Sequence, residues 1–146
     1  MKLIVTKFGG TSVGTIDRIK SVATRIKKEV HNGYNVIVVV SAMAGETNRL
    51  IKLVESLTND YRTSEYDTVI SSGEQVTSGL LAIALNELGI KSKSYQGWQI
   101  PFETDNNFSK ANIKEIKQDK IWFDLNDGYV IVVPGFQGVH KNRVTT

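Results

Sequence analysis

The sequence feature that most constrains the fold is a continuous run of β-branched residues at Val36–Val40, VIVVV. A run this short and this apolar is typical of a strand that is buried on both faces. Amphipathic helical patterns lie on either side of it, one over Ile16–Val30 and one that begins near Thr47 or Asn48. Because strands that alternate with helices favour an α/β fold, we expect a mainly parallel sheet with helices on both faces.

Other segments extend this pattern. Buried strands are predicted at Leu3–Val5 and Tyr129–Val133, and an amphipathic helix is predicted from about Glu74 to Leu88. Weaker patterns predict a strand at Lys91–Tyr95, an edge strand at Ala111–Ile116 and a short helix at Lys120–Leu125. A structured loop is predicted at Gln96–Thr104 and an irregular segment at Asn59–Tyr66. The chain has 146 residues, which is the length of one ordinary domain.

Composition excludes several classes of function. The chain has no cysteine, so disulfides, thiolate catalysis and zinc–thiolate sites are excluded. Its net charge of +3 suits small anionic substrates, and no run of lysine and arginine indicates nucleic-acid binding. No apolar run is long enough to span a membrane and no secretory signal pattern opens the sequence, so we expect a cytoplasmic protein without membrane partners.

A glycine turn follows the first strand, within Leu3–Gly14, LIVTKFGGTSVG. A strand, a glycine turn and a helix together direct backbone N–H groups and a helix N-terminus toward an anion. The stretch is not a Walker A loop, because Gly14 is followed by Thr15 and Ile16, and it is not GxGxxG, because Gly9 and Gly10 are adjacent. Lys7 instead precedes the glycines, and this order predicts a different phosphate cradle. The alternative is a tight turn with a solvated lysine.

Two more turns of small residues end predicted strands, at Ser41–Gly45 and Gly135–Gly138. Ligands of parallel sheets bind beyond the carboxyl ends of the strands, so three such turns at one sheet edge predict a binding site. Ser41 and Thr47 flank the first of these turns, where they either bind a ligand or satisfy local backbone groups. Glu74 lies near the start of its predicted helix, where it either complements the helix dipole or holds an ammonium group.

Four segments together resemble the bacterial aspartate kinases of the amino-acid-kinase family. The segments are KFGGTSVG at Lys7–Gly14, VVSAMAG at Val39–Gly45, SSGEQVTSGLLAIAL at Ser71–Leu85 and GFQGV at Gly135–Val139. The resemblance implies an amino-acid-kinase-like fold. It also implies phosphoryl transfer from ATP to the β-carboxylate of L-aspartate, the first step toward lysine, threonine and methionine.

The resemblance also implies roles for individual residues. Lys7 is the expected catalytic charge on the transferring phosphoryl group, and an ionised carboxylate acceptor needs no general base. The expected ATP-binding residues are Lys7, Phe8, Gly9 and Gly10, and the expected substrate-binding residues are Thr11, Ser12, Ser41, Thr47 and Glu74. Glu74 would pair with the substrate ammonium group. Mg²⁺ is implied by ATP, and no metal-ligating residues are predicted.

One departure from the family concerns the end of the chain. Aspartate kinases continue past the position of Thr146 with Leu-Gly-Arg-Gly-Gly-Ser-Asp, the nucleotide-base half and regulatory ACT domains. Residues 1–146 therefore correspond to the N-terminal, substrate-binding part of a truncated catalytic domain, for which we expect little activity alone. An unfinished sheet predicts a homo-oligomer or association with the missing half. The alternatives are a kinase for another acceptor, such as acetylglutamate or a nucleotide, and a non-catalytic remnant that binds anions or a partner.

Overall fold

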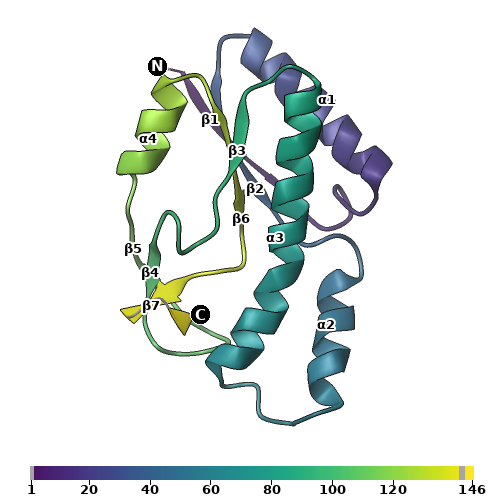
Figure 1. Cartoon of the computed structure of the whole chain (residues 1–146), viewed down its shortest axis with the longest axis vertical. Helices are drawn as coiled ribbons and strands as arrows, with labels where there is room; N and C mark the ends of the chain where they lie inside the picture. Colours follow the sequence, from purple (N-terminus) through teal and green to yellow (C-terminus); the bar gives the residue numbers. More distant parts are fainter. Residues whose placement is uncertain (1, 142–143) are drawn as a thin grey trace.

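A computed structural model describes residues 2–141 and 144–146 of the chain (Figure 1). Its centre is a four-stranded sheet in the order β1-β2-β6-β3, in which all neighbouring strands are parallel. The strands are β1 (Leu3–Phe8), β2 (Asn35–Val40), β3 (Ser92–Ser94) and β6 (Val130–Pro134). The structure therefore confirms the predicted parallel sheet, and it places the apolar run Val36–Val40 beside two other strands.

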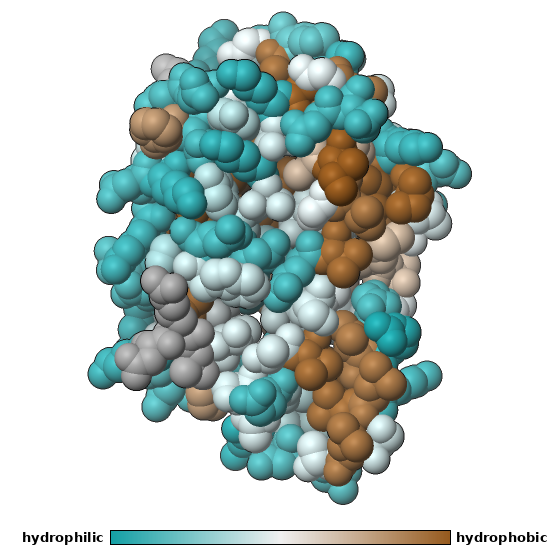
Figure 2. Space-filling view, in the orientation of Figure 1, coloured by the Kyte–Doolittle hydropathy of each residue, from teal (hydrophilic) through white to brown (hydrophobic). Residues whose placement is uncertain are grey.

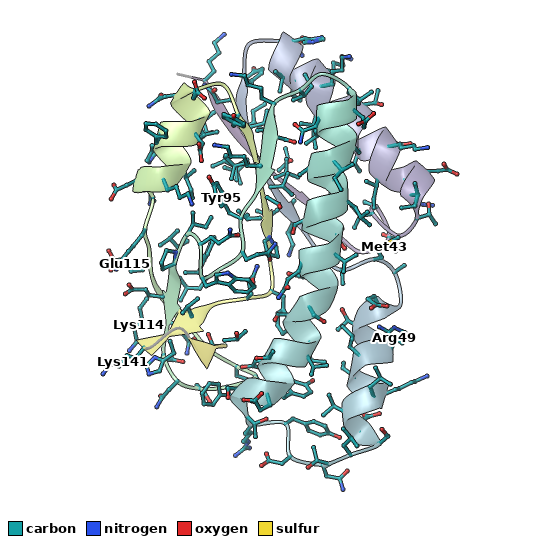
Figure 3. The ribbon with its side chains drawn as sticks, in the orientation of Figure 1. Met43, Arg49, Tyr95, Lys114, Glu115 and Lys141 are labelled. Carbon is teal, nitrogen blue, oxygen red and sulfur yellow. The ribbon has the colours of Figure 1, made fainter. Side chains whose placement is uncertain are left out.

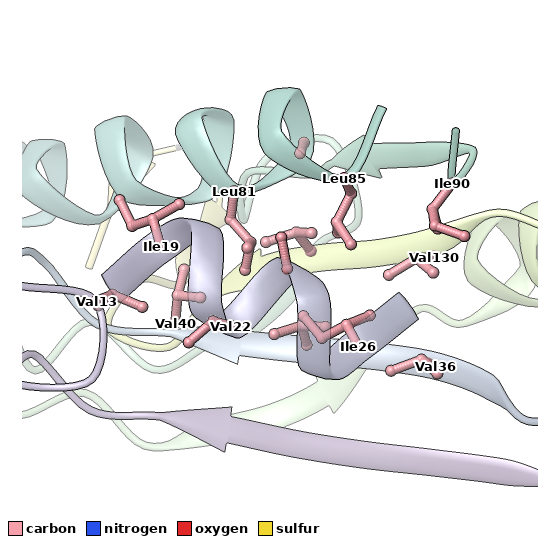
Figure 4. Close-up of a cluster of buried hydrophobic side chains, with 14 residues drawn as sticks. Val13, Ile19, Val22, Ile26, Val36, Val40, Leu81, Leu85, Ile90 and Val130 are labelled. Atoms are coloured by element: carbon pink, nitrogen blue, oxygen red, sulfur yellow. The ribbon is translucent and has the colours of Figure 1, made fainter. Parts of the chain in front are cut away.

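Two helices cover one face of this sheet, α1 (Ile16–His31) and α3 (Ser64–Glu87). Thr15 caps α1 by accepting a hydrogen bond from the Arg18 N–H, and the buried stripe of α1 faces the sheet. Figure 4 shows the resulting core, in which branched side chains from α1, α3, β2 and β6 interdigitate. Leu81 and Leu85 of α3 are fully buried there, against Val38 and Val40 of β2. This core fixes both helices relative to the carboxyl ends of the strands.

The opposite face is covered by the short helix α4 (Asp119–Asn126), so helices lie on both faces as predicted (Figure 1). Ile121 and Leu125 of α4 pack against Ile131 and Val133 of β6. Asp124 is only 2% exposed, and it accepts hydrogen bonds from the Tyr95 hydroxyl and from Lys93 Nζ at 2.6 Å. The buried carboxylate of Asp124 is therefore paired with the ammonium group of Lys93 where α4 meets β3, as a buried charge requires.

A second sheet lies beyond the carboxyl side of the parallel sheet, in the order β5-β4-β7-β8. Its strands are β4 (Phe102–Thr104), β5 (Ile113–Ile116), β7 (Val139–His140) and β8 (Val144–Thr145). The predicted edge strand at Ala111–Ile116 is confirmed as the shorter β5. The prediction of a loop over Gln96–Thr104 is wrong for its last three residues, which form β4 and pair with β5 and β7. This pairing joins distant segments, so the local sequence does not indicate it.

The long helix α3 begins earlier than the sequence predicted. It starts at Ser64, with Thr63 accepting a hydrogen bond from the Tyr66 N–H as its cap, so the end of the predicted irregular segment is helical. Glu74 consequently lies almost three turns inside the helix. The helix dipole acts mainly in the first turn, so it does not explain a carboxylate at this position, and that interpretation is wrong. The small residues Ser71, Ser72 and Gly73, which are typical of turns, hid the continuity of the helix.

Apolar side chains also gather on the outer surface of the molecule. Figure 2 shows them along the side formed by α1, α3 and the helix α2 (Glu46–Glu55). The exposed large apolar residues of these helices are Ile16, Leu53, Val76 and Ile83. Leu57, just beyond α2, is 86% exposed. The groove between α1 and α3, with a volume of about 350 Å³, adds Leu80 and Ala84. In the part of the chain that the structure describes, no helix is long and apolar enough to cross a membrane.

Candidate functional site at the strand carboxyl ends

Backbone hydrogen bonds bring the three predicted turns side by side. The Ser41 N–H donates to the Phe8 carbonyl at 3.1 Å, and the Gly135 N–H donates to the Val40 carbonyl at 2.9 Å. The ladder of the sheet thus continues past the ends of β1, β2 and β6 into the turns. The three small-residue segments therefore meet at one sheet edge, as the parallel arrangement predicted.

The glycine turn packs directly on the turn after β2. A Cβ atom added at Gly10 would lie 3.1 Å from the Ala42 carbonyl oxygen, which is closer than side chains normally approach. The Ser12 N–H donates to the Gly9 carbonyl at 2.9 Å and closes the turn before α1 begins at Ile16. Glycine is needed at position 10 because the backbones of the two turns approach so closely.

These two turns enclose a hollow of about 400 Å³, which we call the α2 hollow. Its lining is Gly10, Thr11, Ser41, Ala42, Met43, Ala44, Gly45, Thr47 and Asn48. Figure 3 labels Met43 in this turn and Arg49 farther along α2, where Arg49 pairs with Glu46 at 2.7 Å. The hollow is small and carries three hydroxyl groups, so its lining suits a small polar ligand.

Glu74 lies beside these turns and is nearly inaccessible to solvent, with 6% of its surface exposed. The residue before it, Gly73, allows α3 to approach closely, because an added Cβ would lie 3.1 Å from both Ala42 Cβ and Glu46 Cγ. The carboxylate accepts a hydrogen bond from the Phe136 N–H in the turn after β6. A mid-helix acid is thereby held between the ends of β2 and β6.

Burial dominates the electrostatics of this carboxyl group. Loss of solvent raises the pKa of Glu74 to about 7, against opposing effects of backbone N–H groups at Phe136, Gly135 and Ala42 and of the positive charge on Lys7. A carboxylate with a raised pKa lacks a full counter-charge, and an added cation would stabilise its ionised form.

This raised pKa predicts how the stability of the chain depends on pH. Between the ordinary glutamate pKa and about 7, the folded state holds a proton that the unfolded state has lost, so the free energy of unfolding falls as pH rises. Urea unfolding of the chain at pH 5 and pH 8 measures this fall, and Glu74→Gln should make it smaller. An equal fall in both proteins would show that Glu74 titrates normally.

A second hollow borders the same glycine turn from the side of α1, and we call it the α1 hollow. It has a volume of about 510 Å³, and its lining is Lys7, Phe8, Ser12, Arg18, Ser21, Val22 and Arg25. The two arginines belong to the exposed face of α1, which the sequence pattern identified only as the polar face of an amphipathic helix. Three predicted site residues, Lys7, Phe8 and Ser12, thus share this hollow with arginines that sequence reasoning did not single out.

The structure divides the predicted site residues into neighbouring groups. The α2 hollow is lined by Gly10, Thr11, Ser41 and Thr47, and the α1 hollow by Lys7, Phe8 and Ser12. Gly9 is exposed in the turn between them, and Glu74 is buried beside the turns. The Phe136 N–H was missed, since a backbone donor 62 residues away has no local sequence signal.

The chain matches known proteins over its whole length. The model of the amino acid kinase family matches residues 2–145. An aspartokinase from Rickettsia felis is 52% identical over 150 residues, and an aspartate kinase from Pseudomonas putida is 49% identical over 146 residues. Each alignment covers 100% of this chain but only 37% and 36% of the relative, so the chain spans little more than a third of the length of these curated relatives.

Solved structures show the same fold. The crystal structure of aspartate kinase from Synechocystis superposes with a TM-score of 0.78 at 36% identity, covering 100% of this chain and 24% of that one. Aspartokinase III of E. coli, in complex with aspartate and ADP, superposes with a TM-score of 0.81 at 21% identity, covering 100% of this chain and 43% of that one. At this lower identity, the second likeness shows the fold alone.

Proposed function

This chain belongs to the amino acid kinase family, and on that premise we propose that it is the aspartate-binding part of an aspartate kinase. In this proposal ATP donates its terminal phosphoryl group to the β-carboxylate of L-aspartate. The relatives named aspartokinase or aspartate kinase support the reaction. The site at the carboxyl ends of the strands supports the role of this chain in binding aspartate. The finer assignments of substrate and residues are our proposal.

The observation that carries the proposal is the buried carboxylate of Glu74 next to the hydroxyl-lined α2 hollow. An amino acid needs a negative partner for its ammonium group, and Glu74 offers one whose ionised form lacks a full counter-charge. Ser41 and Thr47 line the hollow and would bind the amino acid through their hydroxyl groups. Lys7, whose charge acts on Glu74, would lie toward the phosphoryl group.

The proposed chemistry asks little more of the protein than positioning and positive charge. A carboxylate nucleophile is ionised at neutral pH, so no residue must remove a proton from it. Phosphoryl transfer then depends on alignment and on neutralising the transferring group, which we assign to Lys7 and to the amides of Gly9 and Gly10. Among residues 2–141 and 144–146, no group of three or more acidic or histidine side chains could hold a metal ion. Mg²⁺ would therefore arrive bound to the phosphate groups of ATP.

Glu74 also distinguishes an aspartate kinase from the second candidate function, a kinase of the same fold that acts on another acceptor. An N-acylated amino acid such as acetylglutamate has no ammonium group, and a nucleotide acceptor would bring negative charge to a buried carboxylate. Both acceptors would leave Glu74 without a cationic partner. Free L-aspartate is therefore the acceptor that the site favours.

An activity measurement tests the proposal. We expect little or no ATP-dependent formation of aspartyl hydroxamate by the 146-residue chain alone, because it lacks the rest of the length of its relatives. A chimera in which this chain replaces the matching stretch of the Rickettsia felis aspartokinase should be active with aspartate and inactive with acetylglutamate. A chimera that folds but prefers another acceptor would contradict the proposed function, and robust turnover by the chain alone would show that the essential groups are misplaced.

We also infer that the chain associates with itself or with a complementary half. Val5 on the edge strand β1 is 61% exposed, and apolar side chains of α1, α2 and α3 gather along the side of the molecule described above (Figure 2). Exposed apolar surface and an unpaired sheet edge both favour association. Light scattering of the purified chain should therefore give a mass above 16.2 kDa, and a strict monomer at high concentration would contradict self-association.

A further inference from the structure

The α1 hollow collects positive charge that the aspartate-binding arrangement does not use. Lys7 enters it from the end of β1, and Arg18 and Arg25 enter it from α1. No aspartate or glutamate is among the residues that line it. In the described part of the chain, the salt bridges involve other residues, so none of these three cations is paired with a carboxylate. Like charges that share one hollow repel each other, and a bound anion would relieve that repulsion.

Both arginines contact the region where β1 leads into the glycine turn. Arg18 Nη1 donates to the Thr11 carbonyl at 3.0 Å, which ties this guanidinium to the glycine turn. The guanidinium of Arg25 lies 6.0 Å from the centre of the Phe8 ring, at the end of β1. Each guanidinium has further N–H groups in a planar fork that suits phosphate oxygens. Arg18 is therefore tied to the glycine turn, and Arg25 lies near the end of β1, the strand that carries Lys7.

The spacing of the arginines indicates what kind of anion fits. Residues 18 and 25 are seven positions apart on one helix, so their backbones lie about 10 Å apart on nearly the same face. An anion with several linked phosphate groups can contact both guanidinium groups and Lys7 at once. A single phosphate ion can satisfy fewer of them. The hydroxyl of Ser12 lines the same hollow beside Lys7.

We infer that the α1 hollow binds linked phosphate groups, with Arg18 and Arg25 as their contacts. Where the proposed kinase function holds, these would be the phosphates of the donor. The donor would then reach the glycine turn from the α1 side, while the amino acid reaches it from the α2 hollow. Lys7 lines the α1 hollow and acts on Glu74, so it lies where the two ligands would meet. The binding itself depends only on the three cations and does not require turnover.

Binding of tripolyphosphate to the 146-residue chain tests this inference. Calorimetry at low salt, where screening is weak, would compare the wild type with Arg25→Gln and with the control Lys28→Gln. Both variants lose one positive charge from α1, but Lys28 is exposed and does not line the hollow. We expect Arg25→Gln to weaken tripolyphosphate binding roughly threefold to tenfold, which is the range for the loss of one solvent-exposed charged contact. Lys28→Gln should leave the affinity nearly unchanged. Arg25→Lys keeps the charge and should restore part of the affinity.

Several results would overturn the inference. Equal weakening by Arg25→Gln and Lys28→Gln would mean that only the overall charge attracts the anion. Inorganic phosphate that binds as tightly as tripolyphosphate would exclude linked phosphates as the preferred ligand, and so would a folded wild type without measurable binding. The acceptor preference of the chimera is measured separately. Selective tripolyphosphate binding by the chain, together with a folded chimera that does not phosphorylate aspartate, would therefore overturn the proposed function but not the phosphate binding in the α1 hollow.

Discussion

Replacing Lys7 by alanine should lower kcat roughly 10²–10³-fold in the chimera that carries this chain, with a smaller change in the KM for aspartate. That range is typical of losing one preorganised group that stabilises developing charge. Lys7 ends β1 next to the glycine turn, and in our proposal its ammonium group neutralises the phosphoryl group as it moves between two anions. The hydroxamate assay with saturating ATP gives kcat and KM together.

A matched control separates the local role of Lys7 from general loss of charge. Lys28→Ala removes a lysine from the exposed surface of α1, away from both hollows, and should keep wild-type kcat. The effect of Lys7 on Glu74 supplies a second readout. Because the charge of Lys7 lowers the pKa of Glu74, Lys7→Ala should move the rise of aspartate affinity to higher pH. A Lys7→Ala chimera with wild-type kcat would remove Lys7 from the mechanism.

The parallel sheet could be predicted because its signals are local. The runs at Val36–Val40 and Tyr129–Val133 are apolar over consecutive residues; the first lies within β2, and the second becomes β6, which is shifted by one residue to Val130–Pro134. The helical stripe over Ile16–Val30 likewise has a period that sequence alone displays, and α1 occupies that range with one more residue. In each case the residues that form the element also carry the pattern that identifies it.

The second sheet could not be predicted, because it is held together by contacts between distant segments. Phe102–Thr104 pairs with Ile113–Ile116 and touches Val139, and none of these short stretches has a strong strand pattern of its own. The start of α3 was hidden for a different reason. Its Ser-Ser-Gly segment lies where the helix packs closely on the turn after β2, so the small residues serve packing and look like a break.

The candidate site likewise has some features that the sequence predicts and others that depend on contacts between distant segments. The three turns could be predicted to meet, because parallel strands place their carboxyl ends at one edge. The burial of Glu74 and the hydrogen bond from the Phe136 N–H could not be predicted, since both depend on how α3 crosses the ends of β2 and β6. The grouping of Arg18 and Arg25 with Lys7 depends in turn on the rotation of α1 about its axis.

Glu74→Gln should weaken aspartate binding by roughly 1.5–3 kcal/mol in the chimera, the range for a hydrogen bond to a charged group. Glutamine has nearly the same shape and can still accept the Phe136 N–H bond, so the turn after β6 should keep its position. What the variant loses is the negative charge opposite the substrate ammonium group. ATP affinity should hold, because the proposed phosphate contacts lie at the glycine turn and in the α1 hollow.

The pH dependence of aspartate affinity gives this prediction its sharpest form. The ammonium group binds the ionised form of Glu74, whose pKa is raised to about 7 by burial, so wild-type affinity should improve as pH rises through 7. In Glu74→Gln, affinity should be low and flat over the same range. Glu87→Gln, an exposed change near the other end of α3, should retain the wild-type profile. Equal loss of aspartate and ATP binding in Glu74→Gln would instead assign Glu74 to supporting the fold, and an unchanged pH profile would exclude it as the partner of the ammonium group.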